Sequence, residues 1–167
     1  LPVGVSKTET GVRIEPSTGG LATGLKSFYK DYDSQWFGWA GFDRSDFSNS
    51  ELKKIEDAYR KEACIPIYLP QEDVELYYHG FSNETIWPLF HYFPQYTEYR
   101  KETWDAYVRV NRKFSDTIVP VLKPGDKVWI HDYHLLVLPE MIKEKIPEVS
   151  VGFFLHIALV IVLLVVL

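Results

Sequence analysis

A cluster of polar side chains comes directly after a short apolar run near residue 130. The run Val128–Ile130 is typical of a buried strand, and the turn signal Pro124-Gly125-Asp126 precedes it. His131-Asp132-Tyr133-His134 then puts a carboxylate, two imidazoles and a phenol at the carboxyl end of this strand. Ligands of open parallel α/β sheets bind just beyond such strand ends. We therefore expect Asp132 to belong to a functional site.

Three other segments place polar or aromatic groups at the ends of expected strands. Trp39 ends the aromatic run that starts at Trp36, and His156 ends the apolar run over residues 149–155. Gly19-Gly20 lies between a strand and a helix, where backbone N–H groups could approach an anion. A tight turn that requires positive φ explains the two glycines equally well. From chemistry alone, the pattern indicates a small polar ligand whose identity stays open.

The order of the elements predicts the fold class. Strands are expected over residues 1–5, 12–15, 64–69, 128–130 and 149–155, and over 35–41, where a short strand runs into a glycine-containing loop. Helices are expected over 21–28, 51–62, 72–78, 83–91, 97–122 and 135–145. A turn at Gly80–Asn83 separates the third and fourth helices. The longest helix carries one apolar stripe in which Asn111 is the polar member; the stripe consists of Trp104, Tyr107, Val108, Asn111, Phe114 and Ile118. Alternating strands and helices favour an α/β fold, a parallel sheet flanked by helices with right-handed crossovers.

Composition limits the classes of function. The 167 residues suit one domain, and the net charge of −5 argues against a nucleic-acid or anionic-membrane surface. The single cysteine, Cys64, cannot form an internal disulfide; it favours a buried thiol and a reducing, cytoplasmic setting. No secretory signal opens the chain. The apolar run Ala158–Leu167 reads either as part of a membrane span or as a tail that follows a buried strand.

Several kinds of active site are disfavoured. His131, Asp132 and His134 could be imagined as metal ligands, but strand alternation points the first two to opposite faces and no familiar metal spacing is present. The chain has no G-x-S-x-G nucleophile elbow and no G-x-G-x-x-G dinucleotide fingerprint. We therefore expect no metal site and neither of these chemistries.

Seven motifs in order resemble one known family. They are Ser17-Thr18-Gly19-Gly20-Leu21, Trp36-Phe37-Gly38-Trp39, Tyr78-His79-Gly80-Phe81-Ser82-Asn83, Trp87-Pro88-Leu89-Phe90-His91-Tyr92, Trp104-Asp105-Ala106-Tyr107-Val108-Arg109-Val110-Asn111, His131-Asp132-Tyr133-His134 and Gly152-Phe153-Phe154-Leu155-His156-Ile157. Together they resemble the N-terminal domain of the trehalose-6-phosphate synthases, glycosyltransferase family 20. The likeness covers residues 1–157.

The resemblance implies a reaction and a domain organisation. Members of the family are retaining glycosyltransferases of the GT-B type, with two Rossmann-like domains that face each other. They move glucose from UDP-glucose to glucose 6-phosphate, giving trehalose 6-phosphate and UDP, with no catalytic metal or other cofactor. Residues 1–157 would be the acceptor-side domain, without its first strand and phosphate-binding arginine. Residues 158–167 would be an atypical apolar tail, and the C-terminal donor-binding domain would be absent. Such a piece alone is expected to be inactive.

The resemblance also assigns roles to residues of the acceptor side. Trp39, Tyr78 and Trp87 would line the glucose 6-phosphate pocket, with the tyrosine hydroxyl reaching the phosphate. Asp132 would bind sugar hydroxyls where the two substrates meet. Aromatic walls suit the apolar faces of a pyranose, although packing is an equally ordinary role for Trp87, which precedes Pro88 and two apolar residues.

On the donor side, Gly19 and Gly20 would approach the diphosphate through their backbone, and His156 would contact the transferred glucose. Asp132 and His156 are thus the expected catalytic residues. Alternatives are a related enzyme with another phosphorylated acceptor such as glycerol 3-phosphate, a regulatory synthase-like subunit, or a membrane-tethered module. The expected partners are the two small-molecule substrates and a homo-oligomer or synthase/phosphatase complex, with no nucleic acid.

Overall fold

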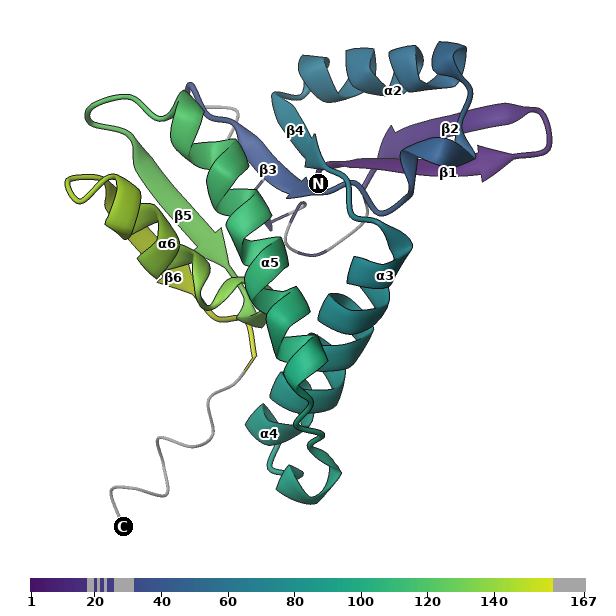
Figure 1. The fold of residues 1–167 in the computed structure, drawn as a ribbon. Coiled ribbons are helices and arrows are strands. Elements are labelled where there is room, and N and C mark those ends of the chain that lie inside the picture. Colours follow the sequence, from purple (N-terminus) through teal and green to yellow (C-terminus); the bar gives the residue numbers. More distant parts are fainter. Residues whose placement is uncertain (18–19, 21, 23, 26–31, 158–167) are drawn as a thin grey trace. The chain divides into compact units, whose positions relative to one another are not determined.

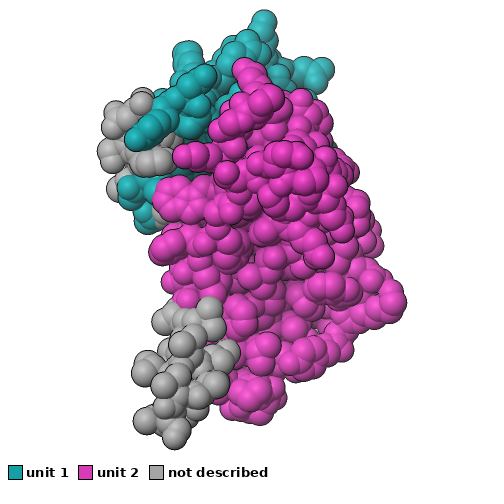
Figure 2. All heavy atoms as spheres, turned by 90° about the vertical axis from the view of Figure 1, so that its left-hand side faces the viewer, with its two compact units in different colours: residues 1–70 teal, residues 71–167 magenta. Residues whose placement is uncertain are grey.

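The computed structural model describes residues 1–17, 20, 22, 24–25 and 32–157 (Figure 1). Its chain divides into two compact units, Leu1–Pro70 and Gln71–Leu167 (Figure 2). The expectation of one domain over residues 1–157 stays a prediction. Gly19, most of the helix expected over 21–28 and the apolar tail 158–167 lie outside the described residues.

The first unit holds an antiparallel hairpin and a parallel strand pair. Strands β1 (Val3–Thr8) and β2 (Gly11–Pro16) form the hairpin, and β3 (Trp36–Trp39) pairs in parallel with β4 (Cys64–Ile67). The 3-10 turn η1 (Arg44–Asp46) and helix α2 (Asn49–Lys61) connect β3 to β4. The strands expected in this region and the helix expected over 51–62 are therefore confirmed.

Helix α2 starts at a capping box and buries one face. The Ser48 side chain accepts a hydrogen bond from the backbone N–H of Glu51, and the Glu51 carboxylate accepts one from the N–H of Ser48. One turn apart on the buried face, Ile55 and Tyr59 join Val3, Phe47 and Cys64 in the core of the unit. Cys64 is thus the buried thiol that the sequence predicts, and burial raises its pKa to about 11.

The second unit begins with one continuous helical stretch. It consists of α3 (Gln71–Asp73), the π-helix η2 (Val74–Ile86) and α4 (Trp87–Phe90), so the expected break at Gly80–Asn83 is wrong. Gly80 does not end the helix but lets it approach α5: a Cβ at Gly80 would lie 2.8 Å from Cγ2 of Thr103. The glycine is explained by helix packing rather than by a turn.

Helix α5 (Lys101–Ile118) is shorter than expected, because residues 97–100 after the 3-10 turn η3 (Pro94–Tyr96) have no regular structure and the 3-10 turn η4 (Val119–Val121) follows its end. Its buried face includes Asn111, as the stripe predicts, and that residue is fully buried. Trp104 does not belong to this face, since it is 42% exposed.

Strands β5 (Lys127–His131) and β6 (Ser150–Phe154) pair in parallel. The 3-10 turn η5 (Tyr133–Leu135) and helix α6 (Leu138–Lys145) connect them, so the helix starts three residues later than expected. Parallel strand pairs joined through helices in both units confirm the α/β fold class. Within the described ranges, none of the helices is both long and apolar enough to cross a membrane.

Candidate functional site

Asp132 follows β5 directly and has an unusual backbone. Its φ of 73° and ψ of 165° lie in a region that is essentially restricted to glycine. The backbone N–H of Asp132 donates to the carbonyl oxygen of Phe154 at 2.8 Å, which continues the β5–β6 pairing by one residue. Side-chain Oδ1 accepts from the N–H of Tyr133 at 2.9 Å and caps η5. The carboxylate is therefore held at the sheet edge and is only partly buried.

His156 lies at the end of the neighbouring strand and contacts His131. Nε2 of His156 and Nδ1 of His131 are 3.1 Å apart, and the two rings are stacked with centroids 5.3 Å apart. The bond requires one protonated and one unprotonated nitrogen. Burial lowers the pKa of His131, the charge on His156 lowers it further, and Asp132 opposes both effects. The carboxyl ends of β5 and β6 thus bring a carboxylate and two imidazoles to one edge.

A row of aromatic rings connects two further predicted residues to this edge. Tyr78 of η2 stacks on His134 with centroids 5.3 Å apart and planes inclined by 9°. The ring centroids of His134 and Tyr133 are 4.0 Å apart, and those of Tyr133 and Trp87 are 5.7 Å apart. Because Tyr133 follows Asp132 in the chain, the row places Tyr78 and Trp87 around the turn that begins at Asp132.

Trp87 presents part of its ring to solvent. It is 43% exposed, and the ring of His91 covers it at a centroid distance of 3.8 Å. Nδ1 of that histidine lies 2.7 Å from the carbonyl oxygen of Trp87 and so fixes the covering ring. The indole therefore keeps surface on which a sugar could stack.

Two rings of the row, those of Tyr133 and His134, are uncharged near pH 7. Burial raises the pKa of Tyr133 to about 12, with the Asp132 charge as a second cause. Burial lowers the pKa of His134, and Asp132 partly offsets this. Nε2 of His134 is buried without a hydrogen-bond partner among the described residues, which disfavours the charged imidazolium. Asp132 thus stands next to neutral rings.

Trp39 and Gly20 belong to the first unit. Trp39 is the last residue of β3 and is partly buried. Gly20 is exposed, and a Cβ at this position would meet no atom within 4 Å, so crowding does not explain the glycine. Their roles as ligand-binding residues stay predictions, as does that of Gly19.

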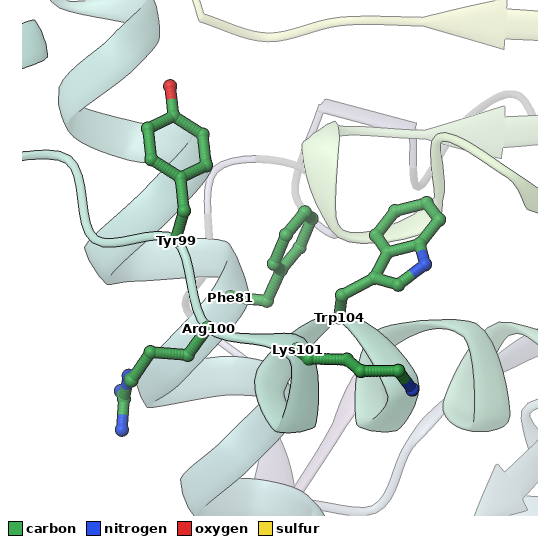
Figure 3. A pocket seen from close by; sticks show the side chains of 5 residues that line it. All are labelled: Phe81, Tyr99, Arg100, Lys101 and Trp104. Carbon is green, nitrogen blue, oxygen red and sulfur yellow. The ribbon is translucent and has the colours of Figure 1, made fainter.

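The described part of the second unit has a surface hollow of about 340 Å³, which the predicted site residues do not line. Its lining consists of Phe81, Tyr99, Arg100, Lys101 and Trp104 (Figure 3). Arg100 forms ion pairs with Glu84, Glu98 and Glu102, and Lys101 pairs with Asp105 at 2.5 Å. Acidic neighbours therefore balance both cations, and none of the predicted site residues lines the hollow.

Among residues that the structure describes, no group of three or more His, Cys, Asp or Glu side chains could hold a metal ion. Two contacts were not predicted from the sequence: that of Tyr133 with Asn83 and that of His131 with His156. The Tyr133 hydroxyl donates to Oδ1 of Asn83 at 3.1 Å and ties the turn to η2. Only the position of Tyr133 in the His-Asp-Tyr-His cluster pointed to this role, because its partner lies 50 residues away.

The family follows from a comparison with family models. Residues 3–160 match the model of glycosyltransferase family 20. The chain belongs to this family. Its relatives include an alpha,alpha-trehalose-phosphate synthase [UDP-forming] of Yarrowia lipolytica, 39% identical over 93% of this chain and 34% of the relative. A bifunctional trehalose-6-phosphate synthase/phosphatase of Thermoproteus tenax is 42% identical over 94% of this chain and 22% of the relative.

Solved structures of glycosyltransferase family 20 relatives have the same fold. An E. coli structure described as trehalose-6-phosphate bound with UDP-2-fluoro glucose has a TM-score of 0.69 at 32% identity, over 86% of this chain and 31% of that one. A Burkholderia xenovorans synthase in complex with glucose-6-phosphate has a TM-score of 0.65 at 31% identity, over 84% and 30%. The chain thus spans about a third or less of the length of these relatives.

Proposed function

We propose that the protein containing this chain transfers glucose from UDP-glucose to glucose 6-phosphate, releasing trehalose 6-phosphate and UDP. Family membership and the synthases at 39% identity support the reaction class. The observation that carries the proposal is Asp132. Its carboxylate is fixed at the carboxyl end of β5 by a strained backbone and a cap, beside the histidines at the ends of β5 and β6.

Asp132 would bind sugar hydroxyls. Oδ1 already accepts the N–H of Tyr133, whereas Oδ2 has no hydrogen-bond partner among the described residues and can accept from a hydroxyl. A charged acceptor forms stronger bonds to hydroxyl donors than a neutral one does. The exposed indole of Trp87 and the ring of Tyr78 would cover the apolar face of the acceptor sugar, and the Tyr78 hydroxyl would reach its phosphate.

Transfer with retention requires the acceptor hydroxyl to be held beside the departing phosphate oxygen. Positioning of this kind accounts for much of the rate of a two-substrate reaction. Charge that develops on the leaving diphosphate needs preorganised donors. We infer that backbone N–H groups at Gly19-Gly20 supply some of them and His156 contacts the transferred glucose. The remainder of a full-length synthase would supply the basic residues.

The proposal includes the setting of the reaction. UDP-glucose and glucose 6-phosphate are the small-molecule partners, and the reaction uses no metal or other cofactor. The buried, unpaired Cys64 supports a reducing compartment such as the cytoplasm. A homo-oligomer or an assembly with a phosphatase is the proposed quaternary state.

Transfer of labelled glucose from UDP-glucose to glucose 6-phosphate by the complete protein tests the function. We expect Asp132→Asn to lower kcat by about a hundredfold or more, because the charged acceptor is lost while the shape is kept. Asp126→Asn is the matched control: Oδ2 of Asp126 accepts a backbone N–H from Lys123 in the turn before β5, so its loss leaves transfer unchanged.

Two outcomes contradict the proposal. Full activity of Asp132→Asn removes Asp132 from the site. If the unsubstituted complete protein makes no trehalose 6-phosphate, the acceptor or the reaction is wrong. Replacing glucose 6-phosphate with glycerol 3-phosphate then decides between another acceptor and a regulatory subunit.

A further inference from the structure

Three buried side chains from two helices converge on the backbone of the turn after Asp132. The Tyr107 hydroxyl donates to the carbonyl oxygen of Tyr133 at 2.6 Å and accepts the N–H of Leu136 at 2.9 Å. Nδ2 of Asn111 donates to the carbonyl oxygen of His134 at 3.1 Å, and the Tyr77 hydroxyl donates to the same oxygen at 3.2 Å. We call Tyr77, Tyr107 and Asn111 the turn clamp.

The turn clamp is rigidly placed. Its three residues are at most 4% exposed, and Nδ2 of Asn111 also donates to the carbonyl oxygen of Tyr107, one helical turn earlier, at 2.9 Å. The Tyr77 and Tyr107 rings are in contact, with centroids 5.7 Å apart. Burial raises the pKa of both tyrosines, so their hydroxyls stay protonated and can donate.

The clamp acts on the backbone that carries the strain. A residue other than glycine stays at the φ and ψ of Asp132 only when its surroundings over-determine them. On its N-terminal side, the N–H of Asp132 is bonded to Phe154 of β6. On its C-terminal side, the clamp bonds the peptide groups of Tyr133, His134 and Leu136. Asp132 is thus held from both sides.

We propose that Tyr107 and Asn111 are positioning residues, which fix the direction of the Asp132 carboxylate without touching the substrates. The catalytic consequence rests on the proposed function. In the described part of the chain, both side chains bond to backbone atoms of the turn and not to the carboxylate, so both act through the turn. The N–H of Tyr133, which donates to Oδ1 of Asp132, transmits the position of the turn to the carboxylate.

Tyr107→Phe is the decisive variant. It keeps the ring that contacts Phe81, Trp104 and Tyr77 and removes only the hydroxyl that bonds Tyr133 and Leu136. Tyr77→Phe removes one of the two donors to the His134 carbonyl, so its effect should be smaller. Tyr59→Phe is the matched control, because Tyr59 is 1% exposed and its buried hydroxyl has no hydrogen-bond partner among the described residues.

Hydrogen exchange on this chain tests the positioning without any substrate. In Tyr107→Phe we expect the amides of Leu136 and Tyr133 to exchange about tenfold faster. The Leu136 amide loses its acceptor, the Tyr107 hydroxyl, and the Tyr133 amide donates to Asp132 and so reports the direction of that carboxylate. The amide of Val110 in α5 should not change relative to the unsubstituted chain. If the Tyr133 amide keeps its rate, or changes only together with Val110, the clamp does not position Asp132.

Kinetics of the complete protein test the catalytic consequence. Tyr107→Phe should lower kcat about tenfold or more, with KM for both substrates nearly unchanged, because displaced catalytic groups cost rate rather than binding. A purely structural role predicts a lower melting temperature with unchanged kcat well below it, and that result overturns the proposal. A complete protein without transferase activity refutes the proposed function alone, since the exchange experiment still decides whether the clamp holds Asp132.

Discussion

The strain at Asp132 predicts that glycine at this position stabilises the fold while it removes the function. A non-glycine residue in this region of φ and ψ costs about 1–3 kcal/mol. Loss of an N-cap side chain costs about 1 kcal/mol when alanine replaces it and a few tenths when glycine does. Asp132→Ala therefore loses about 1 kcal/mol and keeps the strain. Asp132→Gly loses the cap but releases the strain, which leaves a net gain of about 0.5–2.5 kcal/mol.

Asp43 is the matched control for this prediction. It also caps a 3-10 turn, with Oδ1 accepting the N–H of Ser45 at 2.8 Å, but its φ is −88°. Replacing Asp43 by glycine or alanine should change the free energy of unfolding by the capping difference alone, about 0.5–1 kcal/mol in favour of glycine. The advantage of glycine over alanine should be about 1–3 kcal/mol larger at position 132.

Urea unfolding of the four variants, followed by hydrogen exchange in each unit, measures these differences. If the free energies of unfolding of the glycine and alanine variants differ by the same amount at positions 43 and 132, the backbone of Asp132 is not strained. The same Asp132→Gly variant of the complete protein should be inactive in glucose transfer. Its stability and its activity would then move in opposite directions, as expected when strain is retained for function.

Two further predictions concern the second unit. Burial lowers the pKa of His131 and His134 in the folded state from the ordinary histidine pKa of 6.5. As the pH falls, the unfolded chain therefore binds protons before the folded chain does, and the melting temperature should fall between about pH 7 and pH 5. His134→Gln should flatten this fall, and an unchanged slope would show that the buried imidazole does not contribute. Gly80→Ala should lower the free energy of unfolding by about 1–3 kcal/mol, because the new methyl meets Thr103 Cγ2 at 2.8 Å. Thr103→Ser removes that methyl and keeps the hydroxyl bond to the Arg100 carbonyl, so the double variant should recover part of the loss in urea unfolding. The contact of the new methyl group at position 80 with the Glu75 carbonyl oxygen at 3.2 Å remains, and no recovery at all would show that the Thr103 methyl does not cause the loss.

The elements that the sequence predicted well are those that local pattern determines. The apolar run at Val128–Ile130 and the aromatic run at Trp36–Trp39 form strands as expected, because β-branched and aromatic residues favour the extended chain. Helix α2 has a Ser48–Glu51 capping box that marks its start in the sequence itself.

The helix over residues 71–90 could not be read from the same signals. Gly80 and Asn83 are typical of a turn, and a π-helix has no hydrophobic period that a search for 3.6-residue repeats detects. Gly80 is required by Thr103, which lies 23 positions further along the chain, so only the tertiary structure shows why the helix continues.

The candidate site also has features that local sequence pattern predicts and contacts that only the tertiary structure shows. A polar cluster after an apolar run placed Asp132 at a strand end, where the structure has it. The sequence also showed Asn111 as a polar member of an apolar stripe, but its bond to the His134 carbonyl, 23 positions away, was not visible. The contact of His131 with His156 likewise depends on the register of β5 and β6.

The absence of a side chain at Gly80 has a consequence for how this protein can be altered. The helix that bears Tyr77 and Tyr78 lies so close to the helix that bears Tyr107 and Asn111 that a Cβ at Gly80 would come within 2.8 Å of the Thr103 methyl group. The clearance at that point therefore sets the spacing of the aromatic row and of the turn clamp together. Any side chain added at Gly80 would press against α5 and shift Tyr77 and Tyr78 relative to Tyr107 and Asn111, so a variant of the site should leave this glycine in place.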